Sequence, residues 1–160
     1  MTAADYERVV QQSVLDRLID HEPESRLDSL ISRAESLRRL RSSVRRDLEW
    51  LLNTARTEGV PAAFPELQKS VFTYGVVDIA SMSLESPQDA QRLLRSLETA
   101  ITQFEPRLKN VRVTAYDTLS RKRMTLDFHV EALLMIDPAP ERIAFDTIFE
   151  VARGMYTVKE

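Results

Sequence analysis

The chain has 160 residues, of which 43% are hydrophobic, with a net charge of −3 and no cysteine. This length and hydrophobic content predict one domain with a buried core, and the missing cysteines exclude disulfides and thiolate metal sites. The negative charge argues against a general nucleic-acid binder, and no apolar run approaches the ~20 residues of a membrane span. With no cleavable-signal pattern at the N-terminus, we expect a cytoplasmic protein without direct membrane insertion.

Residues 1–24 are predicted to form a mobile N-terminal arm that precedes a single domain, residues 25–160. Within the arm, residues 4–20 have the pattern of a short amphipathic helix, and Glu22-Pro23 breaks it. The apolar positions on one side of this helix are Val10, Val14 and Leu18. Because the arm is more apolar than a free tail needs to be, we expect it to dock. An ordinary first helix of the core is the alternative interpretation.

A long helix is predicted over residues 27–56, because apolar residues recur at steps of three and four. This stripe consists of Leu37, Leu40, Val44, Leu48 and Leu51. Gly59 and Pro61 end the pattern. Trp50 lies off the stripe, four residues after Arg46, so the two side chains can stack. A large aromatic residue on the outer face indicates a cover, either another part of this chain or a partner protein.

Residues 60–85 read as a packed irregular loop in which residues 70–75 form a short extended segment. Ser86-Pro87 then marks a helix start, with a capping serine and a proline in the first turn. Apolar residues repeat at helical spacing from there to residue 104. A second long helix is therefore predicted over residues 86–104.

The remainder of the chain alternates apolar and polar residues, which indicates strands. The predicted strands are 111–115, 124–136, 143–151 and 155–158. Short links predict an antiparallel sheet, and its apolar face needs the two helices as a cover. The predicted fold is α+β, with two main helices on one face of a small antiparallel sheet. The segment 155–160 is expected to be free to pair with an outside strand or to be displaced by one.

Residues 104–108 form the corner between the second helix and the first strand. Pro106 disfavours a helical conformation at Glu105, so the helix ends there. Both Glu105 and Arg107 are expected to point away from the core. Such a pair can serve as a structural cap, a docking point or part of an active site.

Most catalytic and ligand-binding patterns are missing from the sequence. Its three glycines form no phosphate-binding loop, and no Gly-x-Ser-x-Gly motif is present. His21 and His129 form no recognisable metal motif, and His129 is expected to be solvated on the polar side of its strand. Paired carboxylates that include Glu105 leave glycoside hydrolysis open, although nothing marks a saccharide groove. We therefore expect no catalytic residue, no metal and no cofactor.

Four groups of residues occur in an order that resembles a known family. They are residues 43–54 (SVRRDLEWLLNT), residues 70–75 (SVFTYG) with Asp78, residues 104–108 (FEPRL), and residues 145–158, which contain Phe-Asp-Thr and Gly-x-Tyr-x-Val. An early segment, residues 13–18 (SVLDRL), fits as well. The chain resembles TssE, the baseplate family of type VI secretion systems, which is related to the wedge protein of contractile phage tails and carries a lysozyme-like label.

The resemblance implies a structural role in the baseplate wedge, with TssF, TssG and TssK as partners. It implies a fold like the handshake domain of the contractile TssB/TssC sheath, in which strands of neighbouring subunits complete a shared sheet. The family's Glu-Pro-Arg triplet faces the core bundle of the wedge, which makes Glu105, Pro106 and Arg107 expected partner-binding residues. The other expected partner-binding residues are Arg46, Trp50, Met155, Tyr156 and Val158.

The leading interpretation is a non-enzymatic assembly protein that docks on the TssF/TssG bundle and initiates sheath assembly. Two alternatives stay open. One is a peptidoglycan-cleaving, lysozyme-like enzyme with Glu105 as its acid, and the other is a regulatory adaptor on the same fold. The lysozyme-like reading is weakened by Arg107, because a general acid needs an apolar pocket rather than a cation beside it.

Overall fold

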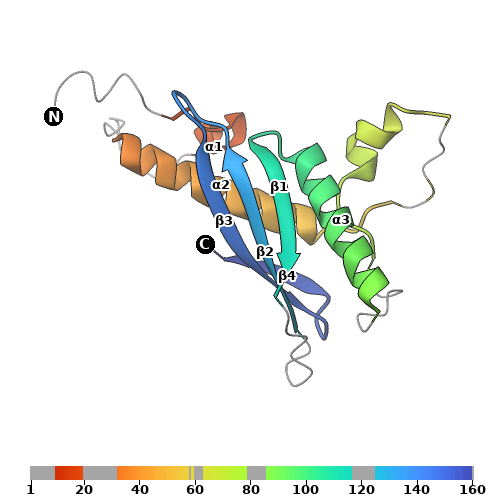
Figure 1. Ribbon diagram of the computed structural model, residues 1–160. Coiled ribbons are helices and arrows are strands. Elements are labelled where there is room, and N and C mark those ends of the chain that lie inside the picture. Colours follow the sequence, from red (N-terminus) through yellow and green to blue (C-terminus); the bar gives the residue numbers. More distant parts are fainter. Residues whose placement is uncertain are drawn as a thin grey trace.

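The computed structural model describes residues 10–19, 32–57, 59, 63–78, 86–116 and 125–159. It is shown in Figure 1. Its elements are α1 (Val14–Leu18), α2 (Arg33–Leu52), η2 (Leu67–Lys69), η3 (Val71–Thr73), α3 (Pro87–Phe104), β1 (Leu108–Ala115), β2 (Thr125–Leu134), β3 (Glu141–Glu150) and β4 (Met155–Lys159). Across these described residues, no helix has the length and apolarity to cross a membrane.

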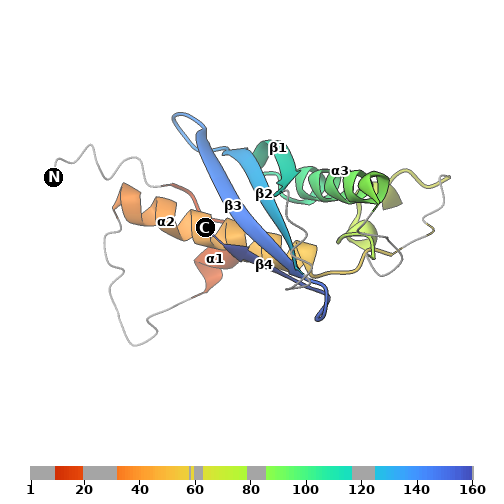
Figure 2. The same ribbon diagram turned by 60° about the horizontal axis from the view of Figure 1, so that its bottom comes forward.

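The four strands form one antiparallel sheet in the order β1-β2-β3-β4, so each strand pairs with its neighbour in sequence. The longest pairing joins β2 to β3, from Thr125 opposite Glu150 to Leu134 opposite Glu141. The two long helices pack against this sheet, α3 along β1 and α2 against β4 (Figures 1 and 2). The predicted α+β architecture is confirmed.

Both long helices begin at serine caps. The side chain of Ser86 accepts a hydrogen bond from the Asp89 N–H, and Pro87 occupies the first turn of α3, as predicted. Ser32 caps α2 by accepting from the Glu35 N–H at 3.2 Å. The predicted end of α2 at residue 56 is wrong, because Asn53 caps the helix and the chain then turns into a bridge between Ala55 and Val76.

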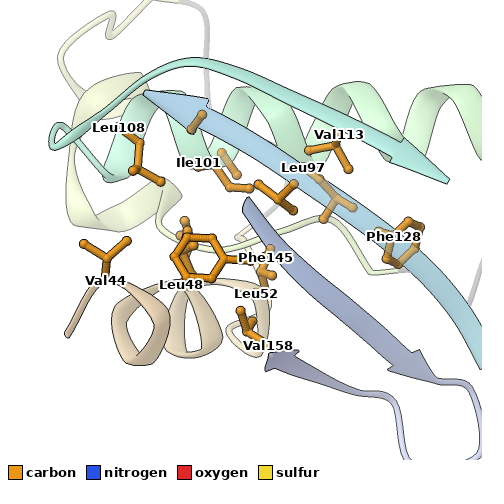
Figure 3. Packing of buried hydrophobic residues seen from close by; sticks show 14 of the residues in the cluster. Val44, Leu48, Leu52, Leu97, Ile101, Leu108, Val113, Phe128, Phe145 and Val158 are labelled. Carbon is orange, nitrogen blue, oxygen red and sulfur yellow. The ribbon is translucent and has the colours of Figure 1, made fainter. Parts of the chain in front are cut away.

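The core lies between the apolar face of the sheet and the two helices (Figure 3). Alternate residues of each strand point into it, including Phe145 of β3 and Val158 of β4, each 1% exposed. The helices contribute Leu48 from α2 and Ile101 from α3, which are 1% and 0% exposed. This alternation places the polar residues of the strands on the opposite face.

The segment before α3 is a turn and not the extended piece predicted for residues 70–75. Residues Val71–Thr73 form the 3₁₀ helix η3, capped by Ser70. Gly75 follows with φ +115° and lets Val76 donate its N–H to the Thr54 carbonyl at 2.9 Å. The Arg56 N–H donates back to the Val76 carbonyl at 2.8 Å, so this turn is fastened to the end of α2.

The N-terminal segment has a different orientation from the predicted one. Only Val14–Leu18 is helical among residues 10–19, and the rest of the predicted arm lies outside the described residues. Val10 is buried, but Val14 and Leu18 are 64% and 76% exposed, so the three do not share one buried side. Polar contacts of Ser13 and Asp16 hold α1 in place.

Candidate docking site at the corner between α3 and β1

Glu105 lies at the corner between α3 and β1 and is turned inward. It caps α3, with its N–H donating to the Ile101 carbonyl at 2.9 Å, and β1 begins three residues later. Glu105 is only 5% exposed. The expectation that it points outward is therefore wrong. Pro106 ends the helix as predicted, but the turn that follows folds the carboxylate back toward α2.

Arg107 binds the Glu105 carboxylate through both of its oxygens. The Arg107 Nε donates to Oε1 at 2.6 Å, and the Nη2 donates to Oε2. The backbone N–H of Arg107 also donates to Oε1, at 3.2 Å. This bidentate arrangement is the strongest hydrogen-bonding geometry between an arginine and a carboxylate.

The same guanidinium group reaches α2. Its Nη2 donates to Asp47 Oδ2 at 2.6 Å, and its Nη1 donates to Ser43 Oγ at 3.0 Å. The other oxygen of Asp47 accepts from Arg46, whose Nε and Nη2 lie 2.9 and 2.7 Å away. The corner is thus fixed to α2 by charge-assisted hydrogen bonds.

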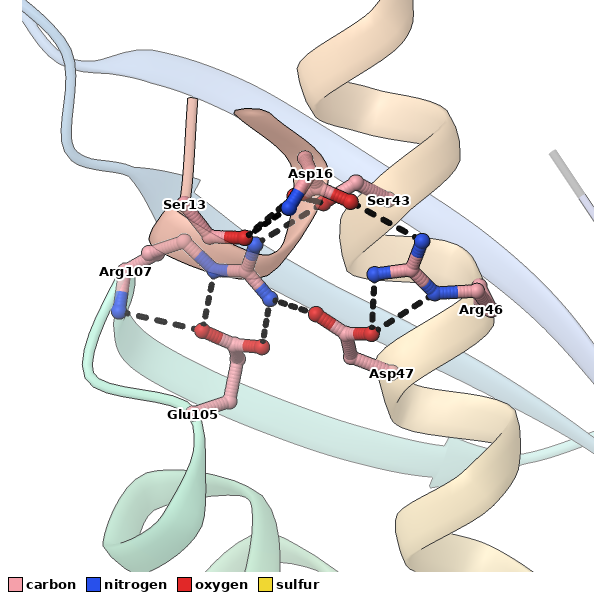
Figure 4. A network of polar contacts seen from close by, with 7 residues as sticks. All are labelled: Ser13, Asp16, Ser43, Arg46, Asp47, Glu105 and Arg107. Carbon is pink, nitrogen blue, oxygen red and sulfur yellow. Dashed lines mark hydrogen bonds and ion pairs between the residues drawn. The ribbon is translucent and has the colours of Figure 1, made fainter. Parts of the chain in front are cut away.

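Asp16 brings α1 into this network (Figure 4). Its Oδ2 accepts from Ser43 Oγ at 2.7 Å and from Ser13, and its Oδ1 lies 2.9 Å from Arg46 Nη1. Three carboxylates and two guanidinium groups therefore share contacts among α1, α2 and the corner. We call this set of residues the corner network: Ser13, Asp16, Ser43, Arg46, Asp47, Glu105 and Arg107.

Contacts within the corner network shift the pKa of Asp16, Arg46 and Arg107 toward their charged forms. Burial raises the pKa of Asp16, but the hydrogen bonds from Ser13, Ser43 and Arg46 outweigh burial and leave the pKa below its ordinary value. For Arg107, burial lowers the pKa, and the bonds to Glu105 and Asp47 reverse this and raise it. Asp16 and Arg107 are therefore held in their ionised forms at neutral pH.

We expect acid to release α1 from α2. Because the pKa of Asp16 is lower in the folded protein, its contribution is complete above the ordinary value of 3.8 and is lost as the pH falls through the lowered value. Backbone amide chemical shifts of residues 13–18, followed by NMR during acid titration, would report the release. An Asp16→Asn variant should lack this transition. The same acid transition in both proteins would contradict the assignment.

A groove of about 620 Å³ opens beside the corner network. Its lining is mostly apolar, and Trp50 and Leu15 are 54% and 49% exposed. The Arg46 guanidinium carbon lies 4.9 Å from the centre of the Trp50 ring, which confirms the predicted stacking. The other lining residues include Tyr74, Phe104, Pro106 and Gln12.

The predicted residues of β4 do not line this groove. Met155 is 54% exposed, but Tyr156 and Val158 are 3% and 1% exposed and belong to the core. Their outward backbone groups are already bonded to side chains of α2. The expectation that this edge is free is therefore wrong.

His129 has partners on the outer face of the sheet that the sequence did not predict. Its Nδ1 lies 2.8 Å from Asp146 Oδ1 and 3.1 Å from the Tyr116 hydroxyl, which itself donates to Asp146 at 3.0 Å. His129 and Asp146 are directly opposite each other in the β2–β3 register. That register was the missing information, since each residue alone reads as an ordinary polar strand position.

The corner network has the geometry of paired ions. The acid of a glycosidase needs a protonated carboxyl group in apolar surroundings. Both oxygens of Glu105 accept hydrogen bonds from Arg107, and the nearby Asp47 shares the same guanidinium. This arrangement fixes the positions of the polar residues that line one part of the exposed, mostly apolar groove.

Residues 38–139 match the family described as baseplate wedge protein gp25. The matched region contains most of α2, all of α3, the corner and strands β1 and β2. Among solved structures, a chain of "The baseplate complex from the type VI secretion system" is similar, with a TM-score of 0.49 and 20% identity over 69% of this chain and 94% of that chain. No curated protein matches. Because the family match covers more than half of the 160 residues, this chain belongs to the baseplate wedge protein gp25 family.

Proposed function

We propose that the protein is a structural component of the type VI secretion baseplate wedge, which docks on the TssF/TssG core bundle and initiates contractile sheath assembly. Membership in the gp25 wedge family supports the structural role. The observation that carries the docking role is the exposed apolar groove beside the corner network. TssK is the third expected wedge partner, and TssB/TssC are the expected sheath partners.

The groove has the composition of a protein-binding surface. Residues that contribute most to binding energy at protein interfaces are enriched in tryptophan and arginine, and here Trp50 lines the groove wall, with Arg46 stacked on its ring. The corner network holds that wall and Pro106 in fixed positions before a partner arrives. Such preorganisation reduces the entropy that is lost on binding.

The corner residues have two roles in this proposal. Glu105 and Arg107 line the groove and shape it through contacts within the chain, while Trp50, Leu15 and Pro106 offer exposed surface to the partner. This docking role requires no catalytic group. The pairing of Glu105 with Arg107 supports a non-enzymatic function.

A Trp50→Ala variant is expected to bind a purified TssF/TssG complex at least roughly tenfold more weakly. Trp50 is 54% exposed, so its removal should leave the fold intact. Phe64→Ala is the matched control, because Phe64 is 58% exposed but does not line the groove. Binding would be measured by surface plasmon resonance. Equal affinity of the Trp50→Ala variant and the wild type would refute docking at this groove.

A further inference from the structure

The outer edge of β4 is occupied by side chains of α2. On its inner side β4 pairs with β3, with Tyr156 opposite Phe149 and Val158 opposite Thr147. Its other side would ordinarily present unpaired N–H and C=O groups, which attract further strands. Here α2 packs against that side.

Asn53 satisfies both backbone groups of Tyr156. The Tyr156 N–H donates to Asn53 Oδ1 at 2.8 Å, and Asn53 Nδ2 donates to the Tyr156 carbonyl at 2.9 Å. A side-chain amide carries the same donor and acceptor as a peptide group. Asn53 therefore reproduces the pair of hydrogen bonds that a residue of a neighbouring strand would make.

Glu49 and Arg45 do the same for Val158. The Val158 N–H donates to Glu49 Oε2 at 3.2 Å, and Arg45 Nη1 donates to the Val158 carbonyl at 3.3 Å. Arg45 and Glu49 also form an ion pair at 3.8 Å. The donor and acceptor of this second edge position are thus divided between two side chains.

The spacing of helix and strand makes this arrangement possible. Positions four apart on a helix are separated by roughly 6 Å, and positions two apart on a strand by roughly 6.6 Å. Residues 45, 49 and 53 of the helix and its cap are therefore spaced nearly as alternate residues of β4 are. We call these three residues the edge ladder.

We propose that the edge ladder takes the place of a fifth strand and closes the β4 edge in the free protein, so that a partner strand adds there only by displacing Glu49 and Asn53. Arg45 and Glu49 side chains are each 38% exposed, so they can turn into water when displaced. An incoming strand supplies the same donors and acceptors to Tyr156 and Val158. The displacement step rests on the proposed sheath function, whereas the closed edge does not.

The test is a Glu49→Ala/Asn53→Ala double variant of the full chain. Hydrogen exchange of the Tyr156 and Val158 amides should accelerate roughly tenfold, because both lose their acceptors. Sedimentation velocity should show the variant associating with itself through the opened edge while the wild type stays monomeric. A Glu35→Ala/Arg38→Ala variant is the matched control, since it removes an ion pair of α2 that does not touch β4.

A conservative change and a sheath assay complete the test. Glu49→Gln keeps an acceptor for Val158 and should behave as the wild type does. If the double variant does not fold, the two single alanine variants replace it. Unchanged exchange at both amides together with a monomeric variant would overturn the closed edge.

The sheath assay tests the displacement step. If the edge of the double variant is open, stronger capture of TssB/TssC by this variant than by the wild type supports displacement. Capture by neither protein would refute strand sharing at β4 and leave the closed edge standing.

Discussion

Replacing Arg107 with alanine is expected to lower the free energy of unfolding by about 3 kcal/mol. The substitution leaves the Glu105 carboxylate, whose side chain is 6% exposed, without its cation. It also removes the Asp47 and Ser43 contacts that fasten the corner to α2. A buried charge that loses its partner is strongly destabilising, because it has been removed from water without compensation.

Urea unfolding at neutral pH would measure this loss. Arg153→Ala is the matched control, since the Arg153 side chain is 73% exposed and pairs with Glu150 on the surface, so its removal should change stability by less than about 1 kcal/mol. A Glu105→Gln/Arg107→Ala double variant should recover part of the loss by removing the stranded charge. Equal stability of the Arg107→Ala and Arg153→Ala variants would show that the corner network does not stabilise the fold.

Replacing Gly75 with alanine should destabilise the protein by about 3 kcal/mol, because steric overlap adds to the backbone strain of a positive φ. At φ +115° a Cβ atom would overlap the Thr54 carbonyl oxygen and lie 2.9 Å from its carbon and 3.0 Å from the Arg56 nitrogen. These are backbone atoms at the end of α2, so they cannot move aside as a side chain would. We expect the bridge between Ala55 and Val76 to open.

Gly154 provides the control for this substitution. It also has a positive φ, +62°, but a Cβ there meets nothing within 4 Å. Gly154→Ala should therefore lower stability by only about 1 kcal/mol, the usual difference for a left-handed position. Thermal unfolding of both variants separates steric overlap from backbone preference. Equal losses at the two glycines would contradict the overlap.

The fold could be predicted from the sequence because local residue patterns identify its helices and strands. The alternation of residues 124–136 and 143–151 needs no knowledge of the rest of the chain, and Ser86-Pro87 places the start of α3 to the residue. The predicted end of a helix was wrong where contacts with a residue distant in sequence determine it. The end of α2 at Leu52 is set by Asn53 and by the bridge to Val76, more than twenty residues later.

The site was predicted only in part, for the same reason. Pro106 marks a corner, but the direction of the Glu105–Arg107 pair depends on Ser43 and Asp47, which accept from Arg107 and lie about 60 residues earlier. The state of the β4 edge depends on Asn53, which is 103 residues from Tyr156. A sequence pattern shows that an edge strand exists, whereas only the packing of α2 shows that its hydrogen bonds are already made.

This separation along the chain has a consequence for how the protein folds. The β2–β3 pairing joins residues 17 apart, such as His129 and Asp146, whereas the edge ladder joins residues 103 apart. Loop-closure entropy rises by about 0.6 kcal/mol for each doubling of the loop, so the second closure is costlier by about 1.6 kcal/mol. The β2–β3 hairpin therefore closes at the lower entropic cost, and packing α2 against β4 is the costlier step that joins the N-terminal half of the chain to its last strand.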